Sequence, residues 1–456
     1  MKSIILTLAA FAFFVITACN KKLEIQPQNS LTNDQIKTSS DVEAVLFGAY
    51  NGMQGAGAFG EGYILTPDLI ASDSQVVFVG TFQDYQAVQH KSAVATNGIA
   101  QNVWGNSYTI INLCNTVLDK ISLVDTNDKN TVQGEALFMR GTAYFELVGL
   151  YGKPYSDGNA ASNLGVPLVL TPTYTYDSSN NSPNKPPRAT VAATYTQIVK
   201  DLLAAIGDLP ASNVDFRADV NSARAILSRV YLSMGDYADA AIQADSVITS
   251  GNFSLTGTFD KAFNNVTNST EDVFAIQQTT QSNAGTTNNG LTTFYATYPV
   301  GRGDAQIDTL FFDLFEPTDF RGSFVTSGKS IAGDVGLYTN KWMTFYKAIP
   351  VVRLAEMYLT RGEGNLMSGG TTGDDPLADI NLVRARSGAS VLTAVAPGDF
   401  IEERFRELSA EGDRFWTLKR WKLGVSGYDY DNNRLILPIP QSEIDVNKNL
   451  VQNGGY

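Results

Sequence analysis

The sequence contains few of the residue types from which most catalytic and metal sites are built. Among its 456 residues there is one histidine, His90, and there are two cysteines, Cys19 and Cys114. A single imidazole excludes a His-rich metal centre and any proton relay that needs two imidazoles. The glycines of residues 55–62 precede no Lys-Ser or Lys-Thr pair, so they indicate flexible turns rather than a phosphate-binding loop. We therefore expect no metal and no cofactor, and we expect His90 in a surface loop.

Positive charge is also scarce. Lys and Arg number 33 against 46 Asp and Glu, which gives a net charge of −13 at pH 7. Such a chain offers no basic stripe that could displace counterions from phosphates, so nucleic acid is excluded as a partner. The same balance argues against adsorption on anionic lipid headgroups. Because only 17% of the residues are charged, we expect a polar but largely uncharged surface, which favours a neutral ligand.

Long apolar runs are missing except for one near the start of the chain. Residues 4–16 are apolar or small, come after Lys2, and are followed by Thr17, Ala18 and Cys19. The run is too short to span a bilayer, which takes about 20 residues, but it matches the hydrophobic part of a secretory signal peptide. The small residues before Cys19 resemble a bacterial lipobox. We therefore predict a lipoprotein signal peptide at residues 1–18 and a lipid anchor on Cys19, the first residue of the mature chain 19–456. An ordinary signal peptide that ends near a cysteine is the alternative.

The fold must be held together by a hydrophobic core, because lipidation of Cys19 leaves Cys114 without a disulfide partner. Apolar residues make up 43% of the chain, and much of their spacing is helical. We expect a mostly α protein, whose first helix begins near Asp41 after an N-cap at Ser39 or Ser40. Helix pairs are expected around residues 104–151, 191–250 and 349–387. Inserted loop regions are expected at 53–100, with one short strand at 75–79, and at 252–345, with low-complexity loops at 171–188 and 279–290.

Small residues and tyrosines follow a tetratricopeptide pattern at one of these helix pairs. Ser228 and Tyr231 precede a turn at Gly235, and Ala240 and Ala244 follow it. Small side chains let a tyrosine enter between two antiparallel helices. The same small-then-Tyr step recurs at Gly141 and Tyr144 and at Ala355 and Tyr358, at separations too long for a tandem array. We therefore expect a tetratricopeptide-like α-α superhelix, right-handed and built from four helix pairs, with an irregular loop-rich lobe inserted. An ordinary helical bundle is the alternative.

Four glutamates crowd one short segment near the C-terminus: Glu402, Glu403, Glu407 and Glu411. Paired carboxylates can perform general acid–base catalysis. However, Arg406 follows Glu402 by four residues and Arg414 follows Glu411 by three, so these acids have cations within reach. A neighbouring cation lowers the pKa of a carboxyl, which is the opposite of what a general acid needs. We interpret these acids as structural, together with Arg353, Glu356, Arg384 and Arg386.

Several segments of the second half of the chain carry recognisable motifs. They are Ile349–Leu359, Asn381–Arg386, Asp399–Trp421, Leu437–Gln441 and Asn449–Asn453. In this order, and after a lipobox, they resemble the SusD/RagB-like outer-membrane lipoproteins of the Bacteroidetes, and the similarity covers essentially the whole mature chain. Two features depart from the family pattern. Lys21 and Lys22 stand where an acidic residue usually follows the lipidated cysteine, and residues 279–345 match least clearly.

The resemblance implies a SusD-like fold and a role in nutrient uptake. Such a protein binds oligo- or polysaccharides and delivers them to a SusC-like TonB-dependent transporter. It is not an enzyme, and it is held by lipid on the outer membrane, facing the cell exterior. Two alternatives stay open: the same assembly with peptide or glycoprotein cargo, and a surface glycoside hydrolase, for which the sequence offers no convincing carboxylate pair.

Aromatic rings outside the helical period are the best candidates for a glycan site. Sugar C–H faces stack on rings, while Asn, Asp and Arg side chains bind hydroxyl groups. The candidate residues lie in the two inserted regions: Asp73, Phe78, Phe82 and Tyr85 in the first, and Tyr295, Tyr298, Arg302 and Trp342 in the second. Burial of these rings in small cores of the loops is the alternative. Trp104 begins a periodic helix and is expected in the core.

Overall fold

The computed structural model describes residues 33–73, 75–175, 179, 182–214 and 216–456. The predicted signal peptide and Cys19 lie outside the described residues. Within those ranges, no helix is both long enough and apolar enough to cross a membrane.

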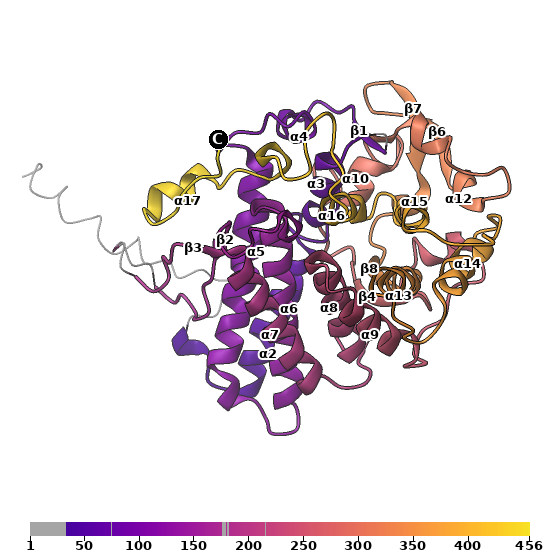
Figure 1. Cartoon of the computed structure of the whole chain (residues 1–456). Coiled ribbons are helices and arrows are strands. Elements are labelled where there is room, and N and C mark those ends of the chain that lie inside the picture. Colours follow the sequence, from indigo (N-terminus) through magenta and orange to yellow (C-terminus); the bar gives the residue numbers. More distant parts are fainter. Residues whose placement is uncertain (1–32, 74, 176–178, 180–181, 215) are drawn as a thin grey trace, which may run out of the picture.

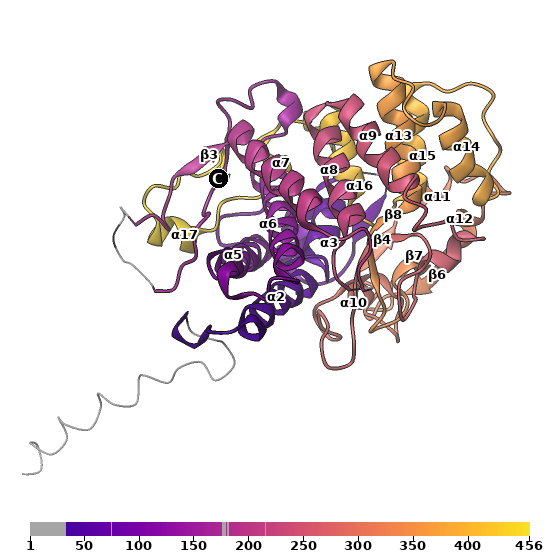
Figure 2. The same cartoon turned by 90° about the horizontal axis from the view of Figure 1, so that it is seen from below.

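Eight helices of the described chain form the main body of the molecule, and each packs against the next (Figures 1 and 2). In this order they are α2 (Ser39–Gln54), α5 (Gly98–Asp119), α6 (Lys129–Tyr151), α7 (Val191–Asp208), α8 (Val220–Met234), α9 (Tyr237–Ile248), α13 (Leu354–Ser368) and α14 (Pro376–Arg386). They can be grouped as α2–α5, α6–α7, α8–α9 and α13–α14, with residues 249–353 inserted before the last pair. The prediction of a mostly α protein is confirmed.

Small residues lie where neighbouring helices approach most closely. Ser228 and Ala244 are fully buried, and Tyr231 is 9% exposed. Helix α8 ends at Gly235, whose φ of 78° is the left-handed conformation that glycine adopts most easily. A β-carbon on Gly364 would lie 2.6 Å from the carbonyl oxygen of Tyr237, so α13 can approach α9 this closely only without a side chain there.

Two local expectations are corrected by the structure. The N-cap of α2 is Thr38 rather than Ser39 or Ser40, because Asp41 completes a capping box with Thr38. Residues 53–100 hold the expected strand but also two helices, α3 (Gly62–Ile70) and α4 (Gln83–Gln89). Helix α3 is buried along its whole length and contains Pro67, so it has neither an amphipathic period nor a typical composition.

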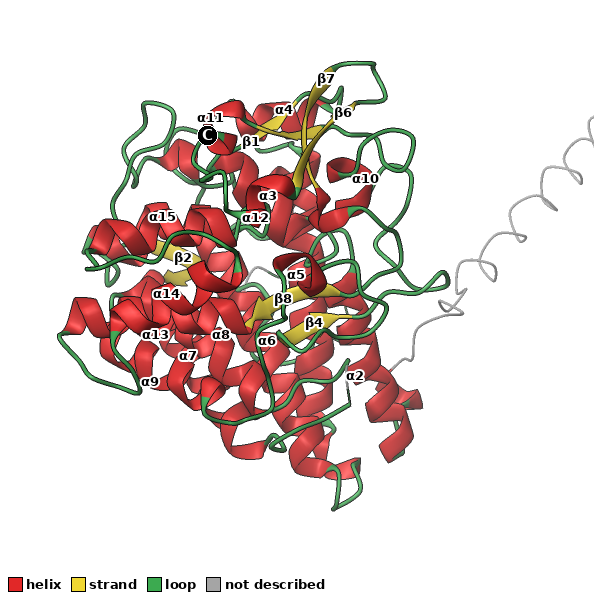
Figure 3. Ribbon diagram, turned by 90° about the vertical axis from the view of Figure 1, so that its right-hand side faces the viewer, coloured by secondary structure: helices red, strands yellow, loops and turns green. Residues whose placement is uncertain are grey.

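An irregular lobe holds most of the strands, and its hairpin β6–β7 projects at one end of the molecule (Figure 3). A four-stranded antiparallel sheet has the order β1-β5-β7-β6. Its strands are β1 (Val76–Phe78), β5 (Ala305–Ile307), β6 (Val325–Lys329) and β7 (Val335–Thr339). Two further antiparallel pairs are β2 (Leu164–Pro167) with β3 (Arg188–Thr190), and β4 (Asp272–Ile276) with β8 (Ile349–Arg353).

The remaining helices are short. Most of them cover the lobe and its junction with the main body, whereas the last one lies at the other end of the molecule, beside α5 (Figure 1). They are α10 (Leu291–Tyr295), α11 (Thr309–Phe312), α12 (Phe320–Ser323), α15 (Pro397–Glu407), α16 (Asp413–Arg420) and α17 (Gln441–Val446). Single 3-10 turns occur at Asn33–Gln35, Ile121–Leu123, Tyr155–Asp157, Phe259–Ala262, Asn340–Trp342 and Asn433–Leu435. Helix α16 packs against both α3 and α8, so the C-terminal part of the chain joins the lobe to the helical body.

The segment after α16 runs back to the first helices. The amide of Leu437 donates a hydrogen bond to the carbonyl oxygen of Leu150 at 2.7 Å, and the Asn453 side chain donates to that of Tyr151 at 2.9 Å. The buried guanidinium of Arg188 donates to the Asn453 side chain at 2.8 Å and to the Val451 carbonyl at 3.0 Å. Residues 437–453 therefore pack against the C-terminal end of α6 and against strand β3, and supply hydrogen-bond partners to both.

Candidate functional site

The glutamates near the C-terminus are held in ion pairs, as their interpretation as structural residues requires. Glu402 pairs with Arg406 at 2.9 Å, as its spacing predicted. Glu411 does not pair with Arg414. It contacts Arg353 at 2.8 Å and Lys341 at 2.6 Å, which come from β8 and from the turn before it. The Arg414 guanidinium lies instead 3.7 Å from the centre of the Phe405 ring.

These contacts belong to a larger buried group, which we call the ionic core. It contains five cations, Arg321, Lys341, Arg353, Arg384 and Arg386, and five acids, Glu271, Asp319, Glu403, Glu407 and Glu411. Burial raises the pKa of Glu407, but the guanidinium groups of Arg386, Arg353 and Arg321 outweigh that effect and hold the pKa at about 2. An acid that stays ionised in this way cannot serve as a proton donor at neutral pH.

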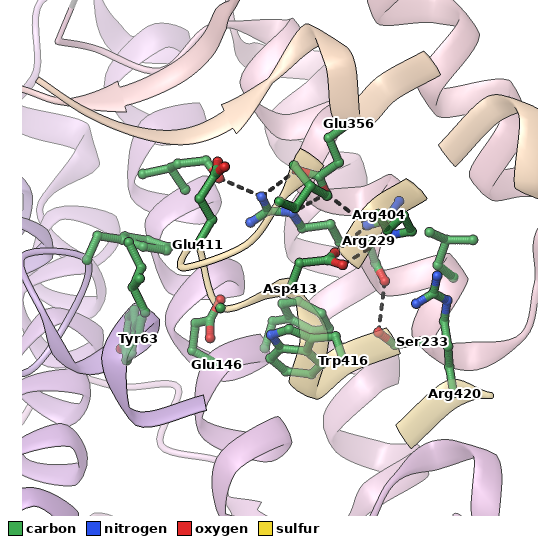
Figure 4. A pocket seen from close by; sticks show the side chains of 17 residues that line it. Tyr63, Glu146, Arg229, Ser233, Glu356, Arg404, Glu411, Asp413, Trp416 and Arg420 are labelled. Carbon is green, nitrogen blue, oxygen red and sulfur yellow. Dashed lines mark hydrogen bonds and ion pairs between the residues drawn. The ribbon is translucent and has the colours of Figure 1, made fainter. Parts of the chain in front are cut away.

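A second polar cluster surrounds an enclosed cavity between α3, α6, α8 and α16 (Figure 4). Arg229 pairs with Glu356 at 2.6 Å, whereas Glu146 has no cationic partner among the described residues, and its Oε2 atom accepts no hydrogen bond. Burial raises the pKa of Glu146 to about 8. The volume open to a water-sized sphere is about 30 Å³, enough for about two waters but not for a sugar ring. The cavity is therefore too small to be the glycan site.

Four of the predicted ligand-binding rings are buried. Phe78 and Tyr85 pack with the Phe294 ring of α10, and all three are less than 5% exposed. Tyr295 is fully buried and donates a hydrogen bond to Asp68 at 2.7 Å, while the Trp342 indole donates to the carbonyl oxygen of Ala410 at 2.9 Å. The inserted regions thus have their own core, and these rings offer no free face for stacking.

The other predicted residues retain exposed surface, and two of them meet although they are far apart in the sequence. The Arg302 guanidinium lies 4.9 Å from the centre of the Phe82 ring and pairs with Asp304 at 2.7 Å. Tyr298, in the same loop as Arg302, is 55% exposed. Backbone hydrogen bonds tie this loop to hairpin β6–β7, from Tyr298 to Lys329 and from Ile331 to Arg302. We call these three residues the Phe82–Tyr298–Arg302 surface.

Asp73 has separate contacts. Its carboxylate accepts a hydrogen bond from the Ser426 amide at 3.0 Å, and its carbonyl oxygen accepts one from Arg414. His90 lies at the end of α4 and is exposed, as expected.

Sequence reasoning missed two features near candidate sites. Glu61 is 2% exposed and lies beneath the aromatic cluster, where its carboxylate accepts hydrogen bonds from the Tyr85 hydroxyl and from the Gly290 amide. An open hollow of about 430 Å³ lies between α5, α17 and the loop before β3, with Trp104 and Tyr108 on its wall. No local pattern could have revealed the buried position of Glu61, because this residue is the only charged one in a glycine-rich stretch. Helical periodicity correctly predicted a buried Trp104, which is 3% exposed.

The chain is similar to known proteins over nearly its whole length. Residues 22–232 match a family described as starch-binding and associating with the outer membrane, and residues 329–435 match the SusD family. SusD-like protein P2 of Formosa agariphila is 26% identical, over 95% of this chain and 96% of its own length. The starch-binding protein SusD of Bacteroides thetaiotaomicron is 36% identical over 122 residues, which are 24% of this chain and 21% of that protein.

Solved structures agree with the sequence matches. A SusD superfamily protein from Bacteroides thetaiotaomicron superposes with a TM-score of 0.80 at 26% identity, over 91% of this chain and 99% of that one. The surface glycan-binding protein A of Bacteroides fluxus shares the fold, with a TM-score of 0.76 at 21% identity over 92% of this chain and all of that one. This protein is therefore a member of the SusD/RagB-like family.

Proposed function

We propose that this protein is a cell-surface lipoprotein that binds a neutral glycan at the Phe82–Tyr298–Arg302 surface and passes it to a SusC-like TonB-dependent transporter. Membership of a family described as starch-binding supports carbohydrate as the cargo class. The observation that carries the location is the contact of Phe82 with Arg302, whose loop also carries the exposed Tyr298 ring. The Arg302 guanidinium covers one face of the Phe82 ring and is held in place there, while the Tyr298 ring is free to stack on a sugar. Exposed rings and a fixed donor of hydrogen bonds are the groups that hold a sugar through stacking and hydroxyl recognition.

The charges around this surface support a neutral ligand over a sulfated or acidic one. Arg302 is already paired with Asp304, which is only 2% exposed along its side chain. The exposed Lys329 of the hairpin is accompanied by the exposed Asp334, and α4 adds the exposed Asp84. An anionic glycan would need uncompensated cations, and the Arg302–Asp304 pair together with these exposed acids leaves little positive charge unbalanced.

The first test is calorimetric titration of the mature chain with a panel of oligosaccharides and peptides, with product analysis after long incubation. We expect binding of a neutral oligosaccharide without turnover. Binding of peptides alone would favour the alternative cargo, and release of shorter sugars would show a hydrolase.

Single aromatic truncations then test the location. Phe82→Ala and Tyr298→Ala should leave the protein folded, and at least one should weaken binding about tenfold, or about 1.4 kcal/mol. Phe320→Ala is a matched control, because this ring is 60% exposed on α12 and outside the proposed surface. Normal binding by both test variants would exclude this surface, and a loss in Tyr108→Ala would then point to the hollow beside α5.

The proposed anchor is tested separately. Cys19→Ala should abolish fractionation with the outer membrane, because Cys19 is the proposed lipid attachment site. A variant that still fractionates with the outer membrane would require another tether.

A further inference from the structure

Glu61 connects two segments that are distant in the sequence. One carboxyl oxygen of Glu61 is hydrogen-bonded to the Tyr85 hydroxyl of α4. The other oxygen accepts a hydrogen bond of 2.6 Å from the amide of Gly290, the residue before α10. The next amide, of Leu291, donates to the carbonyl oxygen of Gly60 at 3.1 Å. The dipeptide Gly60–Glu61 therefore holds the start of α10 against α4.

Helices α4 and α10 position opposite sides of the Phe82–Tyr298–Arg302 surface. Phe82 is the N-cap residue of α4, and its ring lies 5.8 Å from that of Phe294 in α10. The backbone amide of Arg302 donates to the carbonyl oxygen of Thr293, also in α10, at 2.6 Å. Any shift of α10 away from α4 would therefore separate Arg302 from the Phe82 ring.

No cation compensates the Glu61 carboxyl among the described residues. Tyr85 is the titratable side chain that contacts it from α4, and α10 contributes a backbone amide. Of the charged groups on neighbouring segments, Arg302 pairs with Asp304, and Asp84 is exposed to solvent. Burial raises the pKa of Glu61 to about 8, although the Gly290 amide lowers it. The carboxyl is thus neutral at pH 7, and its ionisation would create a buried charge without a counterion.

We propose that Glu61 is a positioning residue for the glycan surface, which sets the distance between Phe82 and Arg302 through its hydrogen bonds to Tyr85 and Gly290 and makes affinity depend on pH. The proposal rests on the proposed function, because its effect is measured as glycan affinity. It assigns Glu61 no contact with the ligand.

The test is the dissociation constant of the best oligosaccharide of the panel, measured from pH 6 to pH 9.5. In the wild type we expect affinity to fall at least about threefold as the pH rises through about 8. Glu61→Gln cannot ionise, so its affinity should be independent of pH. At pH 7 it should bind like the wild type, because its NH₂ group can take the place of the carboxyl O–H beside the Tyr85 hydroxyl while its carbonyl oxygen accepts from the Gly290 amide. Glu61→Ala removes both hydrogen bonds and should bind about three- to tenfold more weakly at pH 7. Tyr85→Phe, which removes one of the two hydrogen bonds, serves as a milder variant if Glu61→Ala does not fold.

Glu146→Gln is the matched control, because Glu146 is also a buried carboxyl with its pKa raised to about 8 but lies in the enclosed cavity. It should keep the wild-type affinity and pH profile. The proposal is overturned if Glu61→Gln binds like the wild type at all pH values, or if Glu146→Gln shows the same changes.

Hydrogen exchange at the Gly290 amide separates this inference from the proposed function. Exchange should be at least about tenfold faster in Glu61→Ala, which removes the acceptor of this amide, whether or not a glycan binds. Unchanged exchange would refute the connection itself, whereas a wild type that binds no oligosaccharide would refute the proposed function alone.

Discussion

Replacing Arg353 by methionine should destabilise the fold by about 3–5 kcal/mol at pH 7, the usual cost of breaking a buried ion pair. The Arg353 side chain is fully buried, and its guanidinium contacts Glu271 at 3.2 Å and Glu407 and Glu411 at 2.8 Å each. Methionine fills much of the volume of the arginine stem but carries no charge. The ionic core would then have four cations against five acids, which leaves one uncompensated negative charge in the interior.

The cost should be smaller in acid. In the wild type, the pKa of Glu407 is lowered from 4.5 to about 2, because the three arginines outweigh the effect of burial. This group therefore contributes stability above pH 4.5 that is lost as the pH falls through about 2. Without Arg353, an acid of the ionic core can take up a proton at a higher pH, which removes the unpaired charge. We expect the difference between variant and wild type to be at least about 1 kcal/mol smaller at pH 4 than at pH 7.

Urea denaturation followed by tryptophan fluorescence at both pH values measures these differences. Lys448→Met is the control, because Lys448 is 58% exposed, pairs with an equally exposed Asp445 at 3.8 Å, and should change stability by less than about 0.5 kcal/mol. An Arg353→Met variant within about 1 kcal/mol of the wild type at pH 7, or with the same deficit at both pH values, would contradict the reasoning.

Three further changes test the packing of the helical body. The raised pKa of Glu146 makes the wild type lose stability as the pH rises from 5 to 8, and Glu146→Gln lacks this titration. The free energy of unfolding of Glu146→Gln should therefore rise relative to that of the wild type by up to about 1.4 kcal/mol per pH unit over this range. Parallel curves of stability against pH would contradict this. Gly149→Ala should lower the urea midpoint strongly, because the new β-carbon would clash with the Trp416 ring, which stacks on Phe145. An unchanged midpoint would mean that the Trp416 ring can move aside at little cost. Tyr231→Ala should cost about 3–5 kcal/mol, since this ring is 9% exposed between helices, and an unchanged melting temperature would show that it contributes little.

The helical body could be predicted from local spacing, because helix pairing depends on small and large residues that recur within one or two turns. Gly235 and Tyr231 show this directly, since a turn and a buried ring lie where the pattern placed them. Helix α3 escaped prediction because a helix buried on all sides has no polar face.

The candidate site depends on contacts that local spacing does not encode. Glu411 was assigned a cation three residues away, yet its partners Arg353 and Lys341 lie 58 and 70 residues earlier in the chain. Likewise, the buried Tyr295 hydroxyl has its hydrogen-bond partner in Asp68, 227 residues away in the sequence. Phe82 and Arg302 were separate candidates in two loops, and only the packing of α4 against α10 brings them together.

The return of residues 437–453 to α6 has a consequence for how the protein is made. Asn453 is synthesised 302 residues after Tyr151, whose carbonyl oxygen it caps, and 265 residues after Arg188. Until this segment is in place, Arg188 lacks two of its acceptors at the edge of the helical body. Contacts of such long sequence separation slow folding, so this edge should remain open to proteases and chaperones until this segment arrives. A nonsense mutation between residues 387 and 436 would therefore yield a chain with all eight helices of the body but without the segment that hydrogen-bonds to the end of α6.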